Sequence, residues 1–252
     1  MRILFLRHGE PYYPTDSLTE RGRREAELLG QRLASWHIRD FYTSPLGRAR
    51  ETAEYTLRAQ GRTAETLDWL AEFRGRYYDP ERQENRLCWD LPPRLWTAHP
   101  ELMDPAHWAD SPLFAGGTIR QVWDETVQGT NELLARYGFR KEGAIWLCDR
   151  NTPDTIALFC HFGISMTVLA WLIDVSPIPL WHHFLTLPSS LTEVVTEERV
   201  PGEVSFRVTR LGDATHLEAN RAGLSTAGLF PECYTGVDST DPEKNLTPEW
   251  VD

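Results

Sequence analysis

The feature that most restricts the fold of this chain is the alternation of short apolar runs with longer amphipathic patterns. Residues 2–6, 38–43 and 155–160 are apolar runs that are too short for helices and are typical of buried strands. Residues 19–35 and 118–137 carry apolar side chains at helical spacing. Strands that alternate with helices predict an α/β fold whose sheet is mostly parallel.

Capping residues indicate where several helices begin and end. Thr19 is the expected N-cap of the first helix, and Ser44-Pro45 is expected to open a second helix that ends near Gly61. Gly138 is expected to end the long helix 118–137. Further elements are expected as follows: a strand over 66–70, a buried helix over 164–173, and an edge hairpin or meander from 190–196 and 204–211.

Residues 74–118 differ from the rest of the chain. They hold six prolines, three tryptophans and five arginines without a clear period. This composition predicts an insertion, partly irregular and partly helical, that lies over another part of the protein. We therefore expect a domain over 1–217 with this insertion as a lid. Residues 218–252 are expected to form a poorly packed C-terminal tail, which begins just after His216.

The charge balance excludes several function classes. The 252 residues include 26 Lys and Arg and 37 Asp and Glu, which gives a formal net charge of −11. A nucleic-acid-binding protein needs a basic face, and no Lys/Arg run supplies one here. The same acidity argues against a role at a membrane surface. A local basic pocket can still bind an anion, so phosphorylated small molecules remain candidate ligands.

The remaining compositional features predict a cytoplasmic protein. The four cysteines form no C-x-x-C pair, so we expect reduced thiols and neither a zinc ribbon nor a redox dithiol. No run approaches the roughly 18 apolar residues that a membrane span requires. The N-terminal segment reaches charged residues too early for a signal peptide.

Two histidines follow two of the predicted strands directly. His8 comes after strand 2–6 and Arg7, and His161 comes after strand 155–160. Each has a glycine within the next two residues, which allows the backbone to approach a ligand closely. A single histidine in a loop is more often structural. However, active sites of α/β sheets lie beyond the carboxyl ends of the strands, so two histidines in such places indicate a site.

Five sequence blocks resemble the histidine phosphatase superfamily, which includes the cofactor-dependent phosphoglycerate mutases and many small phosphatases. The Arg7-His8-Gly9-Glu10 segment carries the signature, and the other blocks follow in the family's order. The blocks are Leu6–Glu10, Leu18–Gly22, Thr43–Ala53, Leu70–Gly75 and Phe159–Gly163. A further segment, Leu211–Leu217, also resembles the family's closing strand. The resemblance implies a three-layer α/β sandwich, with helices on both faces of a mostly parallel sheet that contains one antiparallel strand.

The resemblance also implies the role of each catalytic residue. His8 is the expected nucleophile, and Arg7 and Arg48 are expected to bind phosphate. A guanidinium presents a planar fork that matches two phosphate oxygens. His161, if protonated, adds a further donor. Glu72 stands at the place of the proton donor, and a carboxyl group near phosphate charges has a raised pKa that suits a general acid.

Other residues in the same blocks have simpler interpretations. Arg50 is expected to be solvated, and Cys160 to be a core thiol, because the cysteine-phosphatase arrangement requires an arginine where Met166 stands. Glu20, Glu65 and Asp68 are alternatives to Glu72 as the acid. The remaining histidines lack metal-ligand spacing, so no metal and no cofactor are expected. These histidines are His99, His107, His182 and His183.

The chain departs from the family pattern at two positions. Many relatives have an asparagine phosphate contact where Pro14 stands, after Tyr12 and Tyr13, and a glycine where Phe162 follows His161. Glu10 and the backbone N–H of Phe162 are still expected to contact substrate. The insertion, with Trp89, Trp96 and Trp108, is expected to roof the pocket. Its arginines Arg74, Arg76, Arg82 and Arg86 are either solvated or bind a second anionic group.

These observations favour a metal-independent phosphatase that hydrolyses a small phosphomonoester through a phosphohistidine. Two alternatives remain: an isomerase of the phosphoglycerate mutase type, which returns the phosphoryl group to its substrate, and a phospho-ligand-binding module without turnover. The expected partner is a small phosphorylated substrate, with neither nucleic acid nor membrane, and the protein is a possible homodimer.

Overall fold

The alternation of side chains along the central strands separates two hydrophobic layers. The computed structural model describes residues 1–227. Ile3 and Phe5 of β1 (Arg2–Arg7) point into one core, and Leu4 and Leu6 into the other. β10 (Thr155–Cys160) divides its fully buried side chains in the same way. Because successive residues of a strand face opposite sides, a strand that is apolar throughout must be covered on both faces.

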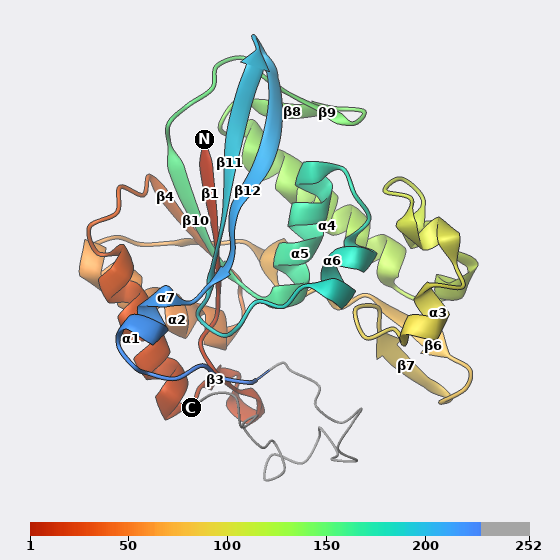
Figure 1. Ribbon diagram of the computed structural model, residues 1–252, viewed down its shortest axis with the longest axis horizontal. Coiled ribbons are helices and arrows are strands. Elements are labelled where there is room, and N and C mark those ends of the chain that lie inside the picture. Colours follow the sequence, from red (N-terminus) through yellow and green to blue (C-terminus); the bar gives the residue numbers. More distant parts are fainter. Residues whose placement is uncertain (228–252) are drawn as a thin grey trace.

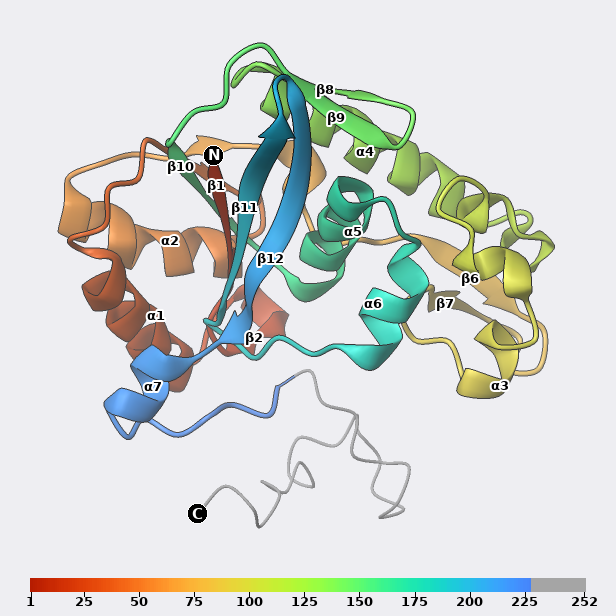
Figure 2. The ribbon, with the colours of Figure 1, turned by 45° about the horizontal axis from the view of Figure 1, so that its top comes forward.

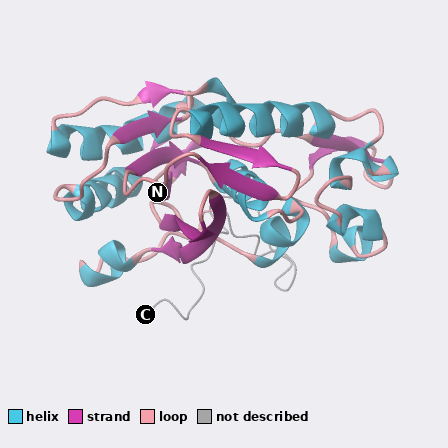
Figure 3. Ribbon diagram, turned by 90° about the horizontal axis from the view of Figure 1, so that it is seen from above, coloured by secondary structure: helices cyan, strands magenta, loops and turns pink. Residues whose placement is uncertain are grey.

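Helices cover both faces of the sheet, as the resemblance implied (Figure 1). α1 (Glu20–Leu33) and α2 (Gly47–Gln60) lie on one side, and α4 (Ile119–Ala135) and α5 (Phe162–Ile173) on the other (Figure 2). Figure 3 shows the strands between the helices. The expected three-layer α/β sandwich is thus confirmed.

The sheet has eight strands in the order β5-β4-β10-β1-β11-β12-β9-β8. The first four are parallel, with Leu4 of β1 opposite Ala157 of β10. The other four extend the sheet through antiparallel pairs. The strands not yet given bounds are β4 (Asp40–Thr43), β5 (Glu65–Thr66), β8 (Phe139–Glu142), β9 (Ile145–Cys148), β11 (Leu191–Val200) and β12 (Glu203–Asp213).

Two expectations about the sheet need correction. β11 and β9 both run opposite to β1, whereas one antiparallel strand was expected. The hairpin formed by β11 and β12 was expected at an edge, but it lies inside the sheet. The reason is the hairpin of β8 and β9, which sequence patterns did not reveal. β9 adds to β12 and moves the edge outward, with Gly143 at φ 59° in its turn.

Two of the predicted helix caps are confirmed and two differ. α4 ends at Ala135 with Arg136 as its C-cap, so Gly138 lies beyond the cap. The Thr19 side chain accepts a hydrogen bond from Gly22 N at 3.0 Å, and Gly61 ends α2 at φ 63°. α2, however, begins at Gly47 rather than at Ser44-Pro45, and its N-cap, Leu46, offers no side-chain acceptor. The expected strand over 66–70 is the short β5 followed by a 3-10 turn over Asp68–Leu70.

The insertion 74–118 is irregular, as predicted, but its tryptophans do not all roof a pocket. Trp108 is fully buried and packs edge-on against Trp123 and Trp181. Trp96 packs against His183. The elements of the insertion are β6 (Arg76–Asp79), β7 (Glu84–Leu87), α3 (Pro93–Trp96) and 3-10 turns over Pro100–Met103, Trp108–Asp110 and Pro112–Phe114. Core packing therefore holds this segment in place.

Two short helices were not predicted. α6 (Pro177–His183) packs against α5, and α7 (Thr215–Ala219) packs against α1 through the buried Leu217. The chain just after His216 is therefore packed, contrary to expectation. Most of the predicted tail, residues 228–252, lies outside the described residues. No helix among the described residues is long and apolar enough to cross a membrane.

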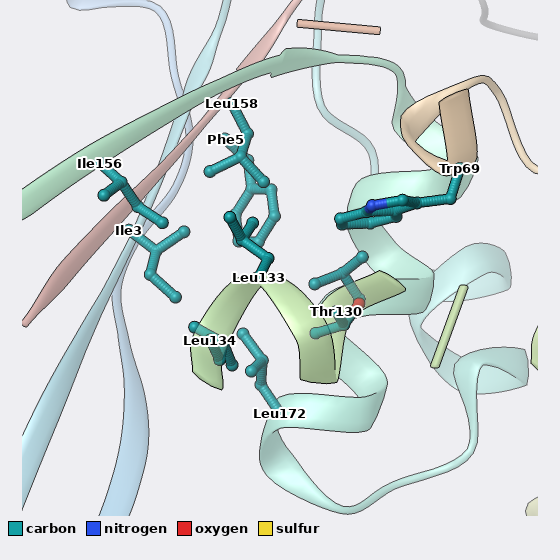
Figure 4. A pocket seen from close by; sticks show the side chains of 10 residues that line it. Ile3, Phe5, Trp69, Thr130, Leu133, Leu134, Ile156, Leu158 and Leu172 are labelled. Carbon is teal, nitrogen blue, oxygen red and sulfur yellow. The ribbon is translucent and has the colours of Figure 1, made fainter. Parts of the chain in front are cut away.

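One small cavity lies between the sheet and α4 (Figure 4). Its volume is about 10 Å³, and Ile3, Leu133 and Leu158 are among the apolar side chains that line it. A space of this size and polarity holds neither a ligand nor a well-bonded water. The cavity is a packing defect and not a functional site.

Candidate active site

The carboxyl ends of three neighbouring parallel strands bring the two predicted histidines together. Arg7 and Cys160 are the last paired residues of β1 and β10, so His8 and His161 follow side by side. His8 N donates to Cys160 O at 3.0 Å, and the two imidazole rings lie 5.0 Å apart, centroid to centroid. Ser44, beyond β4, donates its N–H to Phe159 O at 2.9 Å. Strand pairing alone thus gathers residues from three distant parts of the sequence.

His8 is held in the tautomer that a nucleophile needs. Its Nδ1 lies 2.7 Å from the carbonyl oxygen of Gly9, so Nδ1 carries the proton and Nε2 keeps a free lone pair. The ring is buried, and burial, together with the positive charges of Arg7 and Arg48, holds the pKa of His8 well below its usual range. The imidazole is therefore neutral near pH 7.

Close backbone packing fixes the loop that carries His8. A Cβ at Gly9 would lie 2.5 Å from the carbonyl oxygen of Gly22 on α1, so no other residue fits without displacing the backbone. Gly9 N also donates to Thr52 Oγ1 of α2 at 3.0 Å. The loop is thus attached to both helices on this face of the sheet.

The two predicted phosphate-binding arginines are both largely buried. Arg7 donates through Nη1 to the carbonyl oxygen of Thr186, and its Nη2 reaches Ala227 O at 3.5 Å. Arg48 is 11% exposed at its side chain and pairs with Asp16. In each guanidinium the Nε atom is buried and has no hydrogen-bond partner among the described residues.

His161 presents a third unsatisfied nitrogen. Its Nε2 lies 2.8 Å from Ser44 Oγ, which itself accepts a hydrogen bond from Leu46 N at 3.2 Å. The Ser44 hydroxyl proton is then free to bond His161 Nε2, which leaves the ring proton on Nδ1. That Nδ1 is buried and has no hydrogen-bond partner within residues 1–227.

Three buried donors grouped at this site have no partner among the described residues. Buried polar groups in folded proteins are nearly always paired, so unpaired donors need an explanation. These donors are Arg7 Nε, Arg48 Nε and His161 Nδ1. The charges of Arg7 and Arg48 lower the pKa of His8 and also that of His161, which indicates that the two arginines lie near both histidines. An anion that accepts from all three would satisfy them, and a tetrahedral phosphoryl group has three such oxygens.

Glu72 lies at the N-terminus of α5, beside His161. Its Oε1 accepts hydrogen bonds from Phe73 N at 2.8 Å and from Ile164 N at 2.9 Å. Burial raises the pKa of Glu72, although these two N–H groups oppose the rise. A Cβ at Gly163 would lie 2.7 Å from Oε1, so glycine is required for this approach. The carboxyl group is positioned as an acid whose proton is retained to higher pH than usual.

The sequence model of the histidine phosphatase superfamily (branch 1) matches residues 3–209. This chain belongs to the histidine phosphatase superfamily. A probable phosphatase of Schizosaccharomyces pombe is 26% identical to it over 242 residues, which span 88% of this chain and 98% of the yeast protein.

Solved histidine phosphatase structures share the fold. A mutant phosphoserine phosphatase of Entamoeba histolytica, in complex with phosphoserine, has a TM-score of 0.58 and 19% identity, and the match covers 86% of this chain and 98% of that one. The mycobacterial glucosyl-3-phosphoglycerate phosphatase has a TM-score of 0.58 and 20% identity, with 84% and 98% covered. At such identities the likeness shows the fold alone.

Glu10 and Phe162 were the other two expected substrate contacts of this histidine phosphatase. The carboxylate of Glu10 accepts hydrogen bonds from Thr19 Oγ1 at 2.7 Å and Ser225 Oγ at 2.6 Å, so both of its oxygens have partners. The half-buried Phe162 ring packs against the main core, and the contact of its backbone N–H with substrate stays a prediction. The structure gathers Arg7, His8, Arg48, Glu72 and His161 at one site.

The charge of His161 depends on its surroundings. Burial, followed by the charges of its neighbours, holds the pKa of His161 well below its usual range, so the ring is neutral near pH 7. A bound dianion would oppose this shift, and the expectation of a protonated ring beside phosphate stays a prediction.

Glu65 and Cys160, an alternative acid and an alternative nucleophile, are both engaged in other roles. Glu65 is exposed and pairs with Arg136 at 2.7 Å. Burial raises the pKa of the Cys160 thiol, which therefore stays protonated, as expected for a core cysteine. The described residues contain no cluster of three or more side chains that could hold a metal ion.

A larger hollow of about 420 Å³ lies at the other end of the parallel strands, lined by Arg39, Arg136 and Arg150. Arg39 pairs there with Asp154 and Arg136 with Glu65, so two of its three arginines are already neutralised. It lacks the unpaired buried donors found beside His8, and it does not compete with that site as a phosphate pocket.

Four contributors to the site were missed by sequence reasoning or given another role. Ser44 was predicted as a helix cap, and Thr52 was not singled out. Asp16 and Tyr13 lie in the loop between β2 (Pro11–Tyr12) and β3 (Ser17–Leu18), where they contact Arg48. The only sequence signal for the contact of Asp16 with Arg48 was a carboxylate soon after the His8 block. Its position does not show that it pairs with an arginine 32 residues later.

The neutral histidines generate a prediction for NMR. In ¹⁵N spectra of the ligand-free protein at pH 6.5, His8 should be neutral with its proton on Nδ1, because burial and two arginines disfavour the charged ring. Adding inorganic phosphate should raise the pKa of His161. The signals are assigned by their loss in His8→Gln and His161→Gln. A charged His8 at this pH would contradict the geometry described above.

Proposed function

We propose that this protein is a metal-independent phosphatase that hydrolyses a small phosphomonoester through a phosphohistidine on His8. The observation that carries the proposal is the neutral His8, with its Nε2 free, beside three buried donors that lack partners. A nucleophile and a set of donors for the equatorial oxygens are the two requirements of phosphoryl transfer to a protein side chain.

In the first step, the lone pair of His8 Nε2 forms the P–N bond while the bond from phosphorus to the leaving oxygen breaks. Arg7, Arg48 and His161 donate to the three non-bridging oxygens and stabilise the charge that develops there. The Glu72 carboxyl group gives its proton to the leaving alcohol oxygen. Its raised pKa keeps that proton available near neutral pH.

In the second step, Glu72 is a carboxylate and takes a proton from a water molecule. The water oxygen attacks phosphorus, the P–N bond breaks, and its electron pair returns to His8 Nε2. Inorganic phosphate leaves, and both residues regain their starting protonation. The balance over both steps is one ester and one water converted to one alcohol and one phosphate.

The substrate class rests on the family's phosphorylated ligands and on the insertion. Solved relatives are described in complex with phosphoserine and with 3-phosphoglyceric acid, small esters that carry a carboxylate besides the phosphate. Arg86 and Arg76 are engaged within the insertion, with Asp90 and with Asn85 O. Arg74 is exposed, and its charge contributes to the lowered pKa of His161. Arg74 is thus the insertion arginine best suited to a second anionic group.

Removing the nucleophile tests the mechanism. His8→Ala should lower kcat for p-nitrophenyl phosphate by about 10³-fold or more, because no neighbouring group can accept the phosphoryl. EDTA should leave the wild-type rate unchanged, since arginines supply the charge stabilisation. Near-wild-type activity in His8→Ala, or inhibition by EDTA, would contradict the proposal.

The role of Glu72 is tested with two leaving groups. Glu72→Gln should lower kcat/KM for glycerol phosphate by about 10²-fold or more, and for p-nitrophenyl phosphate much less, because nitrophenolate leaves without a proton. kcat/KM reports the first step, so the later role of Glu72 as a base does not obscure the comparison. Glu65→Gln is the matched control and should change neither value. Equal losses on both esters would assign the acid elsewhere.

Hydrolysis is separated from isomerisation by one assay. A mutase must exclude water until a hydroxyl attacks the phosphohistidine. Here Pro14 and Phe162 replace two residues that usually line the anion pocket of the family, so the fit of this pocket to phosphoglycerate is altered. With 3-phosphoglycerate and catalytic 2,3-bisphosphoglycerate, we expect any turnover to release phosphate. Rapid formation of 2-phosphoglycerate without free phosphate would establish the mutase instead.

A further inference from the structure

The short loop after the His8 block carries contacts that the catalytic mechanism above does not use. It consists of β2, a 3-10 turn over Tyr13–Thr15 and β3 (Figure 2). Pro14 fixes the turn, and Asp16 follows it in the left-handed region at φ 50°. A non-glycine residue in this conformation carries a modest cost, so the surrounding contacts must hold it there.

Asp16 joins this loop to the start of α2. Its Oδ2 accepts a hydrogen bond from Gly47 N at 2.6 Å, and its Oδ1 pairs with Nη1 of Arg48. α2 has no acceptor at its own N-cap and no acidic side chain in its first turn. Asp16 therefore supplies the cap from another segment and at the same time fixes one arm of the phosphate-binding arginine.

Tyr13 covers the same arginine from a second direction. Cζ of Arg48 lies 5.6 Å from the centre of the Tyr13 ring, within the range of a cation–π contact. Asp16 and Tyr13 together restrict the guanidinium before any ligand arrives. The Nε atom of Arg48 remains unpaired, so the restriction leaves a donor for the anion.

The hydroxyl of Tyr13 is free to donate to a ligand. It has no hydrogen-bond partner among residues 1–227, and 64% of the residue is exposed. The phenol whose ring lies against Arg48 therefore has an unused donor beside this phosphate-binding arginine.

We propose that Tyr13 is a further phosphate-binding residue, whose hydroxyl donates to a phosphoryl oxygen held by Arg7 and Arg48. Asp16 is the positioning residue that holds Arg48 for this contact. Tyr13 and Asp16 together take the phosphate-contacting role of the asparagine that many relatives carry where this chain has Pro14. The inference rests on the proposed phosphatase function for the identity of the anion.

The matched control is the adjacent tyrosine. Tyr12 is 50% exposed and lies one residue earlier, in β2, and the cation–π contact with Arg48 is made by Tyr13. If exposed tyrosines near the site contribute only apolar surface, Tyr12→Phe and Tyr13→Phe should behave alike. If Tyr13 binds phosphate, only its hydroxyl should matter.

The experiment measures inorganic phosphate as a competitive inhibitor of p-nitrophenyl phosphate hydrolysis. In Tyr13→Phe we expect Ki for phosphate to rise about tenfold and kcat/KM to fall similarly, as for loss of one hydrogen bond to a charged group. Tyr12→Phe should stay within about twofold of wild type. The phosphate-induced rise in Tm provides a second measure that does not depend on turnover.

Asp16→Asn separates positioning from simple charge. The amide oxygen can still accept from Gly47 N, so Tm should not change. Removing a negative charge would by itself tighten phosphate binding. A rise in Ki of about threefold or more would therefore show that Asp16 acts by holding Arg48. In an Arg48→Ala background, where no guanidinium is left to position, Asp16→Asn should no longer raise Ki.

The outcomes distinguish this inference from the function on which it rests. An unchanged Ki in Tyr13→Phe would overturn the role of Tyr13 while leaving the phosphatase intact. A lower Ki in Asp16→Asn would overturn the positioning role. A wild-type protein that neither hydrolyses phosphate esters nor shifts its Tm with phosphate would overturn the proposed function together with this inference.

Discussion

The parallel pairing of β1 with β10 is the interaction on which the rest of the site depends. The two strands are buried on both faces, so their register is set by two cores at once, and a slip of one residue would reverse every side chain. In that register Arg7 faces Cys160, and the next residue of each strand is a histidine. The same packing that stabilises the sheet therefore sets the separation of the two imidazoles. The glycines that follow let the chain turn away at once against α1 and Glu72.

Burial shifts the pKa values of the two principal groups of the proposed mechanism in opposite directions. It lowers the pKa of His8 and raises that of Glu72, since in both cases the uncharged form is favoured. An uncharged histidine is a nucleophile, and an uncharged carboxyl group is an acid, so one apolar environment serves both. In the proposed mechanism, Arg7 and Arg48 supply the electrostatic stabilisation. Their hydrogen-bond partners among the described residues are two backbone carbonyls and a single carboxylate, which leaves donors for the ligand.

Local sequence patterns predict a helix end where the capping contacts are themselves local. Thr19 and Gly61 cap their helices as predicted, because capping involves neighbours within a few residues. Ser44 shows where they fail: its hydroxyl bonds His161, 117 residues away, and α2 begins later than a local rule suggests. Trp108 was expected over the pocket and lies in the core, because an aromatic residue without a period gives no indication of the face it will occupy.

The sequence by itself determined the alternation of strands and helices, the order of the family blocks, and the five residues of the proposed mechanism. Each of these is carried by residue type, spacing or short-range contacts. Tertiary structure decided which groups surround those five. It brought Asp16 to Arg48, left three buried nitrogens unpaired, and made His161 neutral in the absence of ligand. The physical reason is that hydrogen-bond partners and desolvation depend on which distant segments the packed sheet brings together, and no spacing along the chain encodes them.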